Sequence, residues 1–86
     1  MAYDYQQEKA GIFTETGLQM LLKIRDRADK LLKESGAFRE QELHTTMSGD
    51  SWKMLACVDF LVEKGELKRI HDGGVRQMDV YVRGSE

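Results

Sequence analysis

The sequence predicts an α+β fold in which helices occupy most of the chain and an antiparallel hairpin closes it. Three observations support this prediction. Apolar residues recur at helical spacing over 16–35 and again over 50–64. From Met78 to Arg83 apolar and polar residues instead alternate, as they do in a strand with two different faces. An Asp-Gly-Gly turn at 72–74 precedes this alternation and is typical of a tight hairpin.

Length and charge limit the possible functions. The chain has 86 residues, enough for one small domain with a modest core but not for a deep cleft. We expect that domain over 16–83, between an N-terminal tail at 1–15, with at most a short helical turn, and a tail at 84–86. Its 15 acidic residues outnumber 13 lysines and arginines, which gives a net charge of -2. Because dedicated nucleic-acid binders usually carry a basic excess, such a function depends here on a local concentration of positive charge.

The remaining bulk features favour a cytoplasmic protein. The single cysteine, Cys57, cannot form an intrachain disulfide, which fits a reducing compartment. The first residues lack the basic and then apolar plan of a signal peptide, and no apolar run approaches the length of a membrane span. We therefore expect no membrane association.

The N-terminal segment gives the weakest signal. Asp4 is a suitable cap for a short helical turn that Gly11 would end, but so short a helix is marginal on its own. We expect a frayed tail anchored by Ile12 and Phe13.

The next segment is predicted to be a long helix. Thr16 and Gln19 form a capping box at its start, and Ser35-Gly36 ends it. Its predicted core face consists of Leu21, Ile24, Ala28, Leu31 and Leu32. An outward basic row of Lys23, Arg27 and Lys30 is better explained as a solvated face than as a phosphate-contacting edge.

Two further helices and a hairpin complete the prediction. Glu40 to Thr45 reads as a short helix with Leu43 facing inward, and Asp50 to Lys64 as a longer one. Ser48 and Asp50 cap the longer helix, Gly65 ends it, and its core face consists of Met54, Cys57, Val58 and Leu61. Leu67 to His71 is expected to pair with the final strand across the glycine-containing turn.

This order of elements resembles the winged helix-turn-helix family over roughly residues 16–83. The resemblance is carried by Glu40-Gln41-Glu42-Leu43 as the short helix, Thr46-Met47-Ser48-Gly49 as the turn, and Glu63-Lys64-Gly65-Glu66-Leu67 as the helix stop. It implies three helices with a C-terminal antiparallel wing of two or three strands, in which Ala37 to Arg39 is a short strand that pairs with the wing. It also implies a small DNA-binding transcriptional regulator that docks the 50–64 helix in the major groove and the 67–83 wing on the backbone.

The resemblance assigns candidate residues for contact with double-stranded DNA. Hydroxyl groups around the turn suit phosphate oxygens, and lysine, arginine and histidine side chains around the wing provide a local basic excess. The assigned set is Thr45, Thr46, Ser48, Ser51, Trp52, Lys53, Ala56, Lys68, Arg69, His71 and Arg76.

The same helix also supports a different function. Its outward row is predicted to be Trp52, Ala56, Asp59, Phe60 and Glu63, which contains no arginine and two carboxylates. Within that row Trp52, Ala56 and Phe60 form an apolar stripe. Either the first helix and the N-terminal tail cover this stripe, or it is a protein interface or a dimer contact of a winged helix that does not bind DNA.

Enzymatic function is not expected. The sequence shows no paired carboxylates, no nucleophile beside a base and no phosphate-binding glycine loop beyond the hairpin turn. His44, Cys57 and His71 lack ligand-like spacing, and Cys57 is better explained as a small core residue. We expect neither a metal nor a cofactor.

Overall fold

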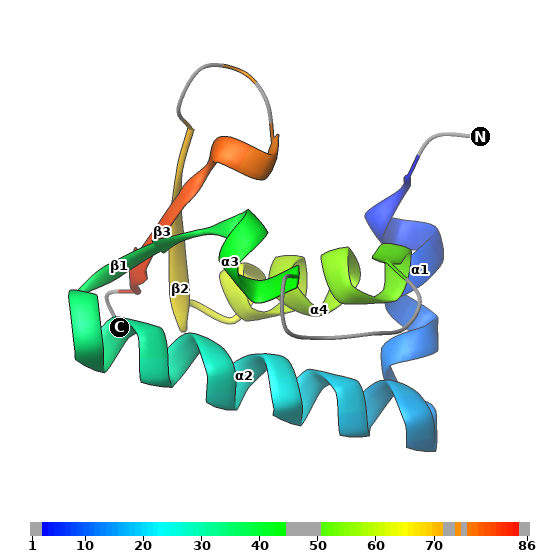
Figure 1. Cartoon of the computed structure of the whole chain (residues 1–86). Helices are drawn as coiled ribbons and strands as arrows, with labels where there is room; N and C mark the ends of the chain where they lie inside the picture. The colour runs from blue at the N-terminus through cyan, green and yellow to red at the C-terminus, as the bar shows by residue number, and fades with distance from the viewer. Residues whose placement is uncertain (1–2, 45–50, 72–73, 75, 85–86) are drawn as a thin grey trace.

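The computed structural model describes residues 3–44, 51–71, 74 and 76–84. Within them the chain forms α-helices and a three-stranded antiparallel sheet, which confirms the α+β class. The long helix α2 (Glu15–Ser35) runs along one side of the molecule, and α4 (Ser51–Glu63) lies against it (Figure 1). Helix α1 (Tyr5–Ile12) stands at one end of this pair and the sheet at the other (Figure 1).

The N-terminal segment is a helix and not the frayed tail that the sequence suggested. The carboxylate of Asp4 accepts a hydrogen bond from the backbone N–H of Gln6 at 3.0 Å, so the predicted cap is confirmed. α1 then continues to Ile12, whose side chain is fully buried. Its packing against α4 and α2 explains why eight residues hold a helix that would be marginal in isolation.

The capping box predicted at Thr16 and Gln19 is wrong, because the long helix begins at Glu15 and its N-cap lies two residues before Thr16. Thr14 is the N-cap, and its hydroxyl accepts a hydrogen bond from the backbone N–H of Gly17 at 3.1 Å. Gly17 also lies against the end of α1, because a Cβ atom there would come within 2.0 Å of the Gly11 carbonyl oxygen. The predicted C-terminal stop is confirmed, since Gly36 has a φ of 77°.

The sheet has the strand order β1-β3-β2. The strands are β1 (Ala37–Arg39), β2 (Leu67–Ile70) and β3 (Val80–Arg83), and both neighbouring pairs are antiparallel. The short first strand and the C-terminal hairpin were both predicted. A 3-10 turn, η1 (Arg76–Met78), was not predicted and delays the start of the last strand until Val80.

The helices α3 (Glu40–His44) and α4 supply the rest of the core. Leu43 is buried, as are the four predicted core residues of α4: Met54, Cys57, Val58 and Leu61. Gly65 has a φ of 81° and ends α4 as predicted, whereas the caps assigned to Ser48 and Asp50 lie outside the described residues. Among the described residues, no helix combines the length and apolar character needed to span a bilayer.

Candidate functional site

The hairpin and α4 meet in a cluster of charged and polar side chains, here called the α4–hairpin cluster. Its members come from five elements and from the residue before β3. They are Glu40 of α3, Asp59 of α4, Arg69 of β2, Arg76 of η1, Asp79 just before β3, and Tyr81 of β3. These positions surround the helix that the resemblance assigns to DNA reading. The cluster therefore decides which charges that face can offer to a ligand.

Arg76 links two carboxylates from different elements. Its Nε donates to both carboxylate oxygens of Glu40 at 2.9 Å, and its terminal nitrogens donate to Asp59 at 2.8 and 3.2 Å. One terminal nitrogen also donates to the backbone carbonyl of Leu55 at 3.4 Å. The guanidinium group thus ties η1 to α3 and α4 at once.

Arg69 makes the corresponding contacts from the strand. Its Nε donates to the Tyr81 hydroxyl at 3.0 Å, and a terminal nitrogen pairs with Asp59. The Tyr81 hydroxyl in turn donates to Glu40 at 2.8 Å. Arg69 also lies 3.7 Å from a carboxylate oxygen of Asp79. Every contact therefore turns the arginine toward the interior side of the sheet.

Two of the carboxylates are almost fully enclosed. Glu40 is 1% exposed and Asp79 is 3% exposed, so each needs cationic or hydrogen-bonding partners to remain in place. Asp59 is less enclosed. Burial alone would raise the pKa of Asp59, but hydrogen bonds from Arg76, Tyr3 and Arg69 together outweigh burial and hold the pKa below its ordinary value.

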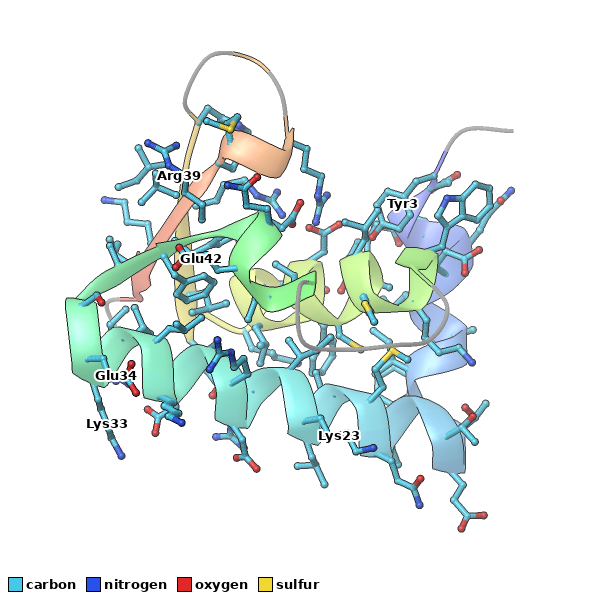
Figure 2. The ribbon with its side chains drawn as sticks, viewed as in Figure 1. Tyr3, Lys23, Lys33, Glu34, Arg39 and Glu42 are labelled. Atoms are coloured by element: carbon cyan, nitrogen blue, oxygen red, sulfur yellow. The ribbon has the colours of Figure 1, made fainter. Side chains whose placement is uncertain are left out.

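Helix α1 covers the outward face of α4. The Tyr3 hydroxyl donates to Asp59 at 2.6 Å, where Figure 2 shows Tyr3 beside α4, and burial together with this bond raises the pKa of Tyr3. Further along α1, Lys9 pairs with Glu63 at 2.8 Å, and the Tyr5 hydroxyl donates to the same carboxylate. The chain's own N-terminal segment therefore occupies the surface on which a DNA groove or a partner was expected.

The N-terminal segment also covers part of the apolar stripe that was predicted on α4. Ala56 is 0% exposed, so its assignment to a DNA or protein interface is wrong. The ring of Phe60 packs edge to face against that of Phe13, with centroids 5.7 Å apart. Trp52 remains half-buried. Of the two explanations offered for the stripe, coverage by the N-terminal segment is the one that the structure confirms.

The predicted DNA-contacting residues fall into three groups. Thr45, Thr46, Ser48 and the side chain of Ser51 lie outside the described residues. Arg69 and Arg76 were expected to lie in an exposed basic surface. This expectation is wrong, because both guanidinium groups are paired with carboxylates of the same chain. Lys53 is half-buried near the start of α4, whereas Lys68 and His71 are exposed on the hairpin, His71 with its Nδ1 3.3 Å from Asp79.

Sequence reasoning missed Glu40, Tyr81 and Asp79 as members of this site. Glu40 appeared only as part of a short helix, and the other two only as one face of an alternating strand. The alternation does hold a signal, since the face with the polar residues is the buried one: Tyr81 is 0% exposed and stacks on Phe38 at 5.5 Å. An aspartate two residues before a buried tyrosine needs a cation, and two arginines stand nearby in the sequence.

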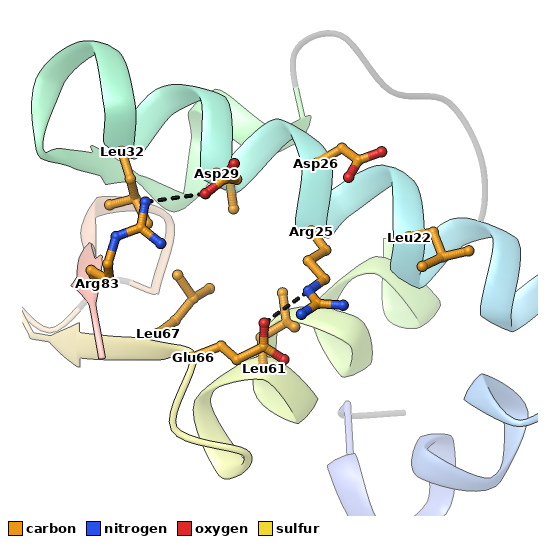
Figure 3. A pocket seen from close by; sticks show the side chains of 10 residues that line it. Leu22, Arg25, Asp26, Asp29, Leu32, Leu61, Glu66, Leu67 and Arg83 are labelled. Atoms are coloured by element: carbon orange, nitrogen blue, oxygen red, sulfur yellow. Dashed lines mark hydrogen bonds and ion pairs between the residues drawn. The ribbon is translucent and has the colours of Figure 1, made fainter. Parts of the chain in front are cut away.

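A second site is a groove of about 340 Å³ between α2 and the hairpin (Figure 3). Its floor is apolar and includes Leu61 and Leu67, and two ion pairs cross its rim. Arg25 pairs with Glu66 at 2.8 Å, and Arg83 pairs with Asp29 at 3.1 Å (Figure 3). The described lining contains neither a cysteine nor a histidine, so it offers no nucleophile–base pair.

Metal binding has no geometric support in the part of the chain that the structure describes, where no group of three His, Cys, Asp or Glu side chains converges. Burial raises the pKa of Cys57 to about 11, which keeps its thiol protonated and unreactive near neutral pH. No family model, curated protein or solved structure matches this chain.

Proposed function

We propose that this chain is a winged helix-turn-helix domain that binds double-stranded DNA as a small transcriptional regulator. The observation that supports this proposal most is the order of the elements. α2, β1, α3 and α4 are followed by the β2–β3 hairpin, and β1 completes the sheet on the free side of β3. In the winged helix this order brings a second helix and a hairpin to the same side of the domain, where both reach a duplex.

Docking is shallow in this proposal. Helix α1 lies over the outward face of α4, and Asp59 and Glu63 on that face are anionic, so deep insertion into a groove is unfavourable. Contact is instead assigned to the first turn of α4, around the half-buried Lys53, and to the hairpin. In the hairpin, His71 and Gly74 are exposed. These groups suit phosphate oxygens more than base edges, so binding without strong sequence preference is expected first.

A chemical-shift titration tests this proposal. Isotope-labelled protein is titrated with a short random-sequence duplex at low and at moderate salt. Shifts are expected at the backbone amides of residues 51–53 and 71–76, and they should weaken as salt rises. A duplex that shifts neither segment contradicts the proposal.

A pair of charge-removing variants sharpens this test. Lys53→Gln should weaken binding and reduce its salt dependence, because one phosphate contact is lost. Lys23→Gln removes the same charge from α2, where Figure 2 shows Lys23 pointing away from the body of the protein. Equal losses in the two variants would mean that only net charge matters and that α4 does not dock.

A second candidate function is protein association, which one observation favours independently. Phe13, Leu18 and Leu22 are 59%, 44% and 56% exposed; Phe13 lies between α1 and α2, and Leu18 and Leu22 are one helical turn apart near the start of α2. This surface replaces the stripe of Trp52, Ala56 and Phe60 as the candidate interface. Leu22→Asp should lower the average mass measured by light scattering if copies associate there, whereas Lys23→Asp should not. A monomer at all concentrations would remove self-association through this surface.

A further inference from the structure

We propose that the free edge of β2 is a docking surface for an acidic, extended segment of a protein partner, which adds to the sheet as a further strand. β2 lies at one edge of the sheet, and among the described strands its backbone pairs with β3 alone (Figure 1). An edge strand presents unpaired N–H and C=O groups, and an extended peptide can pair with them. Docking of this segment does not require DNA binding, although His71 lines the groove and also belongs to the proposed DNA contact.

A groove of about 430 Å³ runs along this edge. It is lined by successive residues of β2 and by Val62 of α4, while its described lining contains no residue of Val80–Arg83. The groove therefore lies beside the free edge and not over the middle of the sheet. At one end it is lined by Gly65 and Gly84, whose backbones pack against each other, since a Cβ atom at Gly84 would come within 1.9 Å of the Gly65 carbonyl oxygen.

The opposite edge of the sheet is less suited to strand addition. β1 has three residues, is followed directly by α3, and packs against α2. β2 has four residues, and its principal contacts in the described structure are with β3 and α4. At about 3.4 Å per residue this edge matches a partner segment of four to six residues.

Charge selects the occupant. The groove lining includes Lys68, Arg69 and His71 and no carboxylate among the described residues. Arg69 is already paired with Asp59, so the exposed Lys68 is the charge that an incoming strand meets first. A carboxylate opposite Lys68 would gain a cross-strand ion pair, whereas a lysine or arginine there would be repelled.

The same charge argues against a second copy of this chain as the occupant. Pairing two β2 edges would bring the basic residues of both copies together, and like charges across paired strands are destabilising. Edge lysines commonly prevent such self-pairing. Lys68 therefore repels the basic β2 edge of a second copy and attracts an acidic segment, and this combination of repulsion and attraction produces specificity.

Side-chain alternation defines the partner sequence more closely. Lys68 and Ile70 are exposed on one face of β2, whereas Leu67 is buried on the other. A paired strand places its residues on the same faces as their neighbours. The preferred segment therefore has a carboxylate opposite Lys68, an aliphatic residue opposite Ile70, and an apolar residue between them that enters the groove near Val62.

The experiment uses the full chain and a capped hexapeptide in which glutamate is followed by two valines, so that glutamate can lie opposite Lys68 and the valine two positions away opposite Ile70. Addition of this probe should shift the backbone amide signals of 67–71 and slow their hydrogen exchange, because the free edge becomes hydrogen-bonded. The same peptide with lysine in place of glutamate should bind more weakly. A version with alternate backbone nitrogens methylated should not bind, because it cannot complete the ladder.

Two variants provide the matched control. Lys68→Glu should weaken the glutamate peptide by about tenfold and improve the lysine peptide, since an attraction becomes a repulsion. Lys30→Glu makes the same change of net charge on the exposed face of α2 and should leave both affinities unchanged. Because both lysines are exposed, neither change is expected to unfold the protein.

Four results would overturn the inference. Unshifted signals of 67–71 with the glutamate peptide, or equally strong binding of the methylated version, would exclude strand addition. A response of the β2 amides to a DNA duplex and not to the peptide would make this surface a phosphate site. A shift with protein concentration alone would make the occupant a second copy.

Discussion

At the scale of single residues, Arg76 links two carboxylates that come from different helices. It joins Glu40, which is 1% exposed, to Asp59, and its own side chain is 29% exposed. Removing one partner of such a pair leaves a carboxylate without its cation in a poorly solvated place. The role that the contacts support for Arg76 is therefore to hold η1 against α3 and α4.

This role predicts a large effect of Arg76→Met on stability. The substitution keeps most of the side-chain volume but removes the charge, so the free energy of unfolding should fall by about 3 kcal/mol. Arg25→Met is the matched control, because Arg25 forms an exposed pair with Glu66 and should lose less than about 1 kcal/mol. Urea denaturation measures both. Equal losses would mean that the α4–hairpin cluster adds no more than a surface ion pair does.

The depressed pKa of Asp59 predicts how stability depends on pH. A carboxyl group whose pKa is lower in the folded than in the unfolded chain stabilises the fold above its unfolded pKa of about 3.9. That stabilisation is lost as the pH falls through the folded pKa. The free energy of unfolding should therefore be nearly constant from about pH 7 to about pH 5 and should decrease below about pH 4.

Denaturation of Asp59→Asn across the same pH range checks the assignment. The variant should be less stable near neutral pH but should show a smaller decrease in acid. Glu63 and Asp29 also have lowered pKa values, because Lys9 and Lys33 respectively hydrogen-bond to them, so some acid dependence should remain. An unchanged decrease in the variant would assign the acid sensitivity to those exposed groups instead.

Sequence reasoning at this scale succeeded where local spacing decides burial and failed where distant partners decide orientation. Cys57 was predicted to be buried because helical periodicity places it with Val58 and Leu61, and all three are buried. Arg69 and Arg76 were predicted to face a ligand. Their carboxylate partners lie between 10 and 36 positions away in the chain, and no local pattern encodes such a pairing.

At the scale of elements, α1 depends on a close crossing with α2. Gly17 allows this crossing, since a Cβ atom there would lie 2.0 Å from the Gly11 carbonyl oxygen and 2.8 Å from Ile12. These are backbone atoms of another helix and cannot move aside as a flexible side chain can. Gly11, in contrast, would place a Cβ atom 3.8 Å from the Lys53 side chain, which is an ordinary contact.

Two glycine-to-alanine substitutions should therefore have opposite effects. Gly11→Ala should stabilise the protein by about 0.5 to 1 kcal/mol, because alanine is the better helix former and space is available. Gly17→Ala should destabilise it, by about 1 to 3 kcal/mol, because overpacking displaces α1. Thermal unfolding followed by circular dichroism compares the two. If both variants were stabilised, the crossing would have to be looser than it is described.

The extent of α1 is also the largest difference between the expected and the observed elements. The cap at Asp4 and the anchor at Ile12 were both identified, yet the segment was expected to fray because helical propensity over so few residues is weak. What stabilises it is tertiary: Tyr3 and Lys9 reach carboxylates of α4 that are more than fifty positions away. By contrast, each hairpin strand was predictable, since alternation and a glycine-containing turn are local signals.

At the scale of the whole molecule, pairing of opposite charges limits any electrostatic attraction to DNA. Arg69 and Arg76 are held by the α4–hairpin cluster, Arg25 and Arg83 by carboxylates at the rim of the groove, and Lys9 by Glu63. The net charge is -2. The order of the elements concerns the topology of the chain, whereas the ion pairs decide which charged side chains are left to attract DNA. A predicted DNA-binding fold and an acidic net charge are therefore compatible.

This distribution predicts a shallow salt dependence for the proposed DNA binding. If the contact neutralises only about two to three phosphates, log K should fall with log salt with a slope of about −2 to −3. Fluorescence anisotropy with a labelled duplex at several salt concentrations measures the slope. A value near −6 or steeper would require a broad basic surface, which would mean that the α4–hairpin cluster opens and releases Arg69 and Arg76 to the phosphates. Repeating the measurement with Arg76→Met distinguishes the two cases, since the slope should be unaffected by this change only if the cluster stays closed on the duplex.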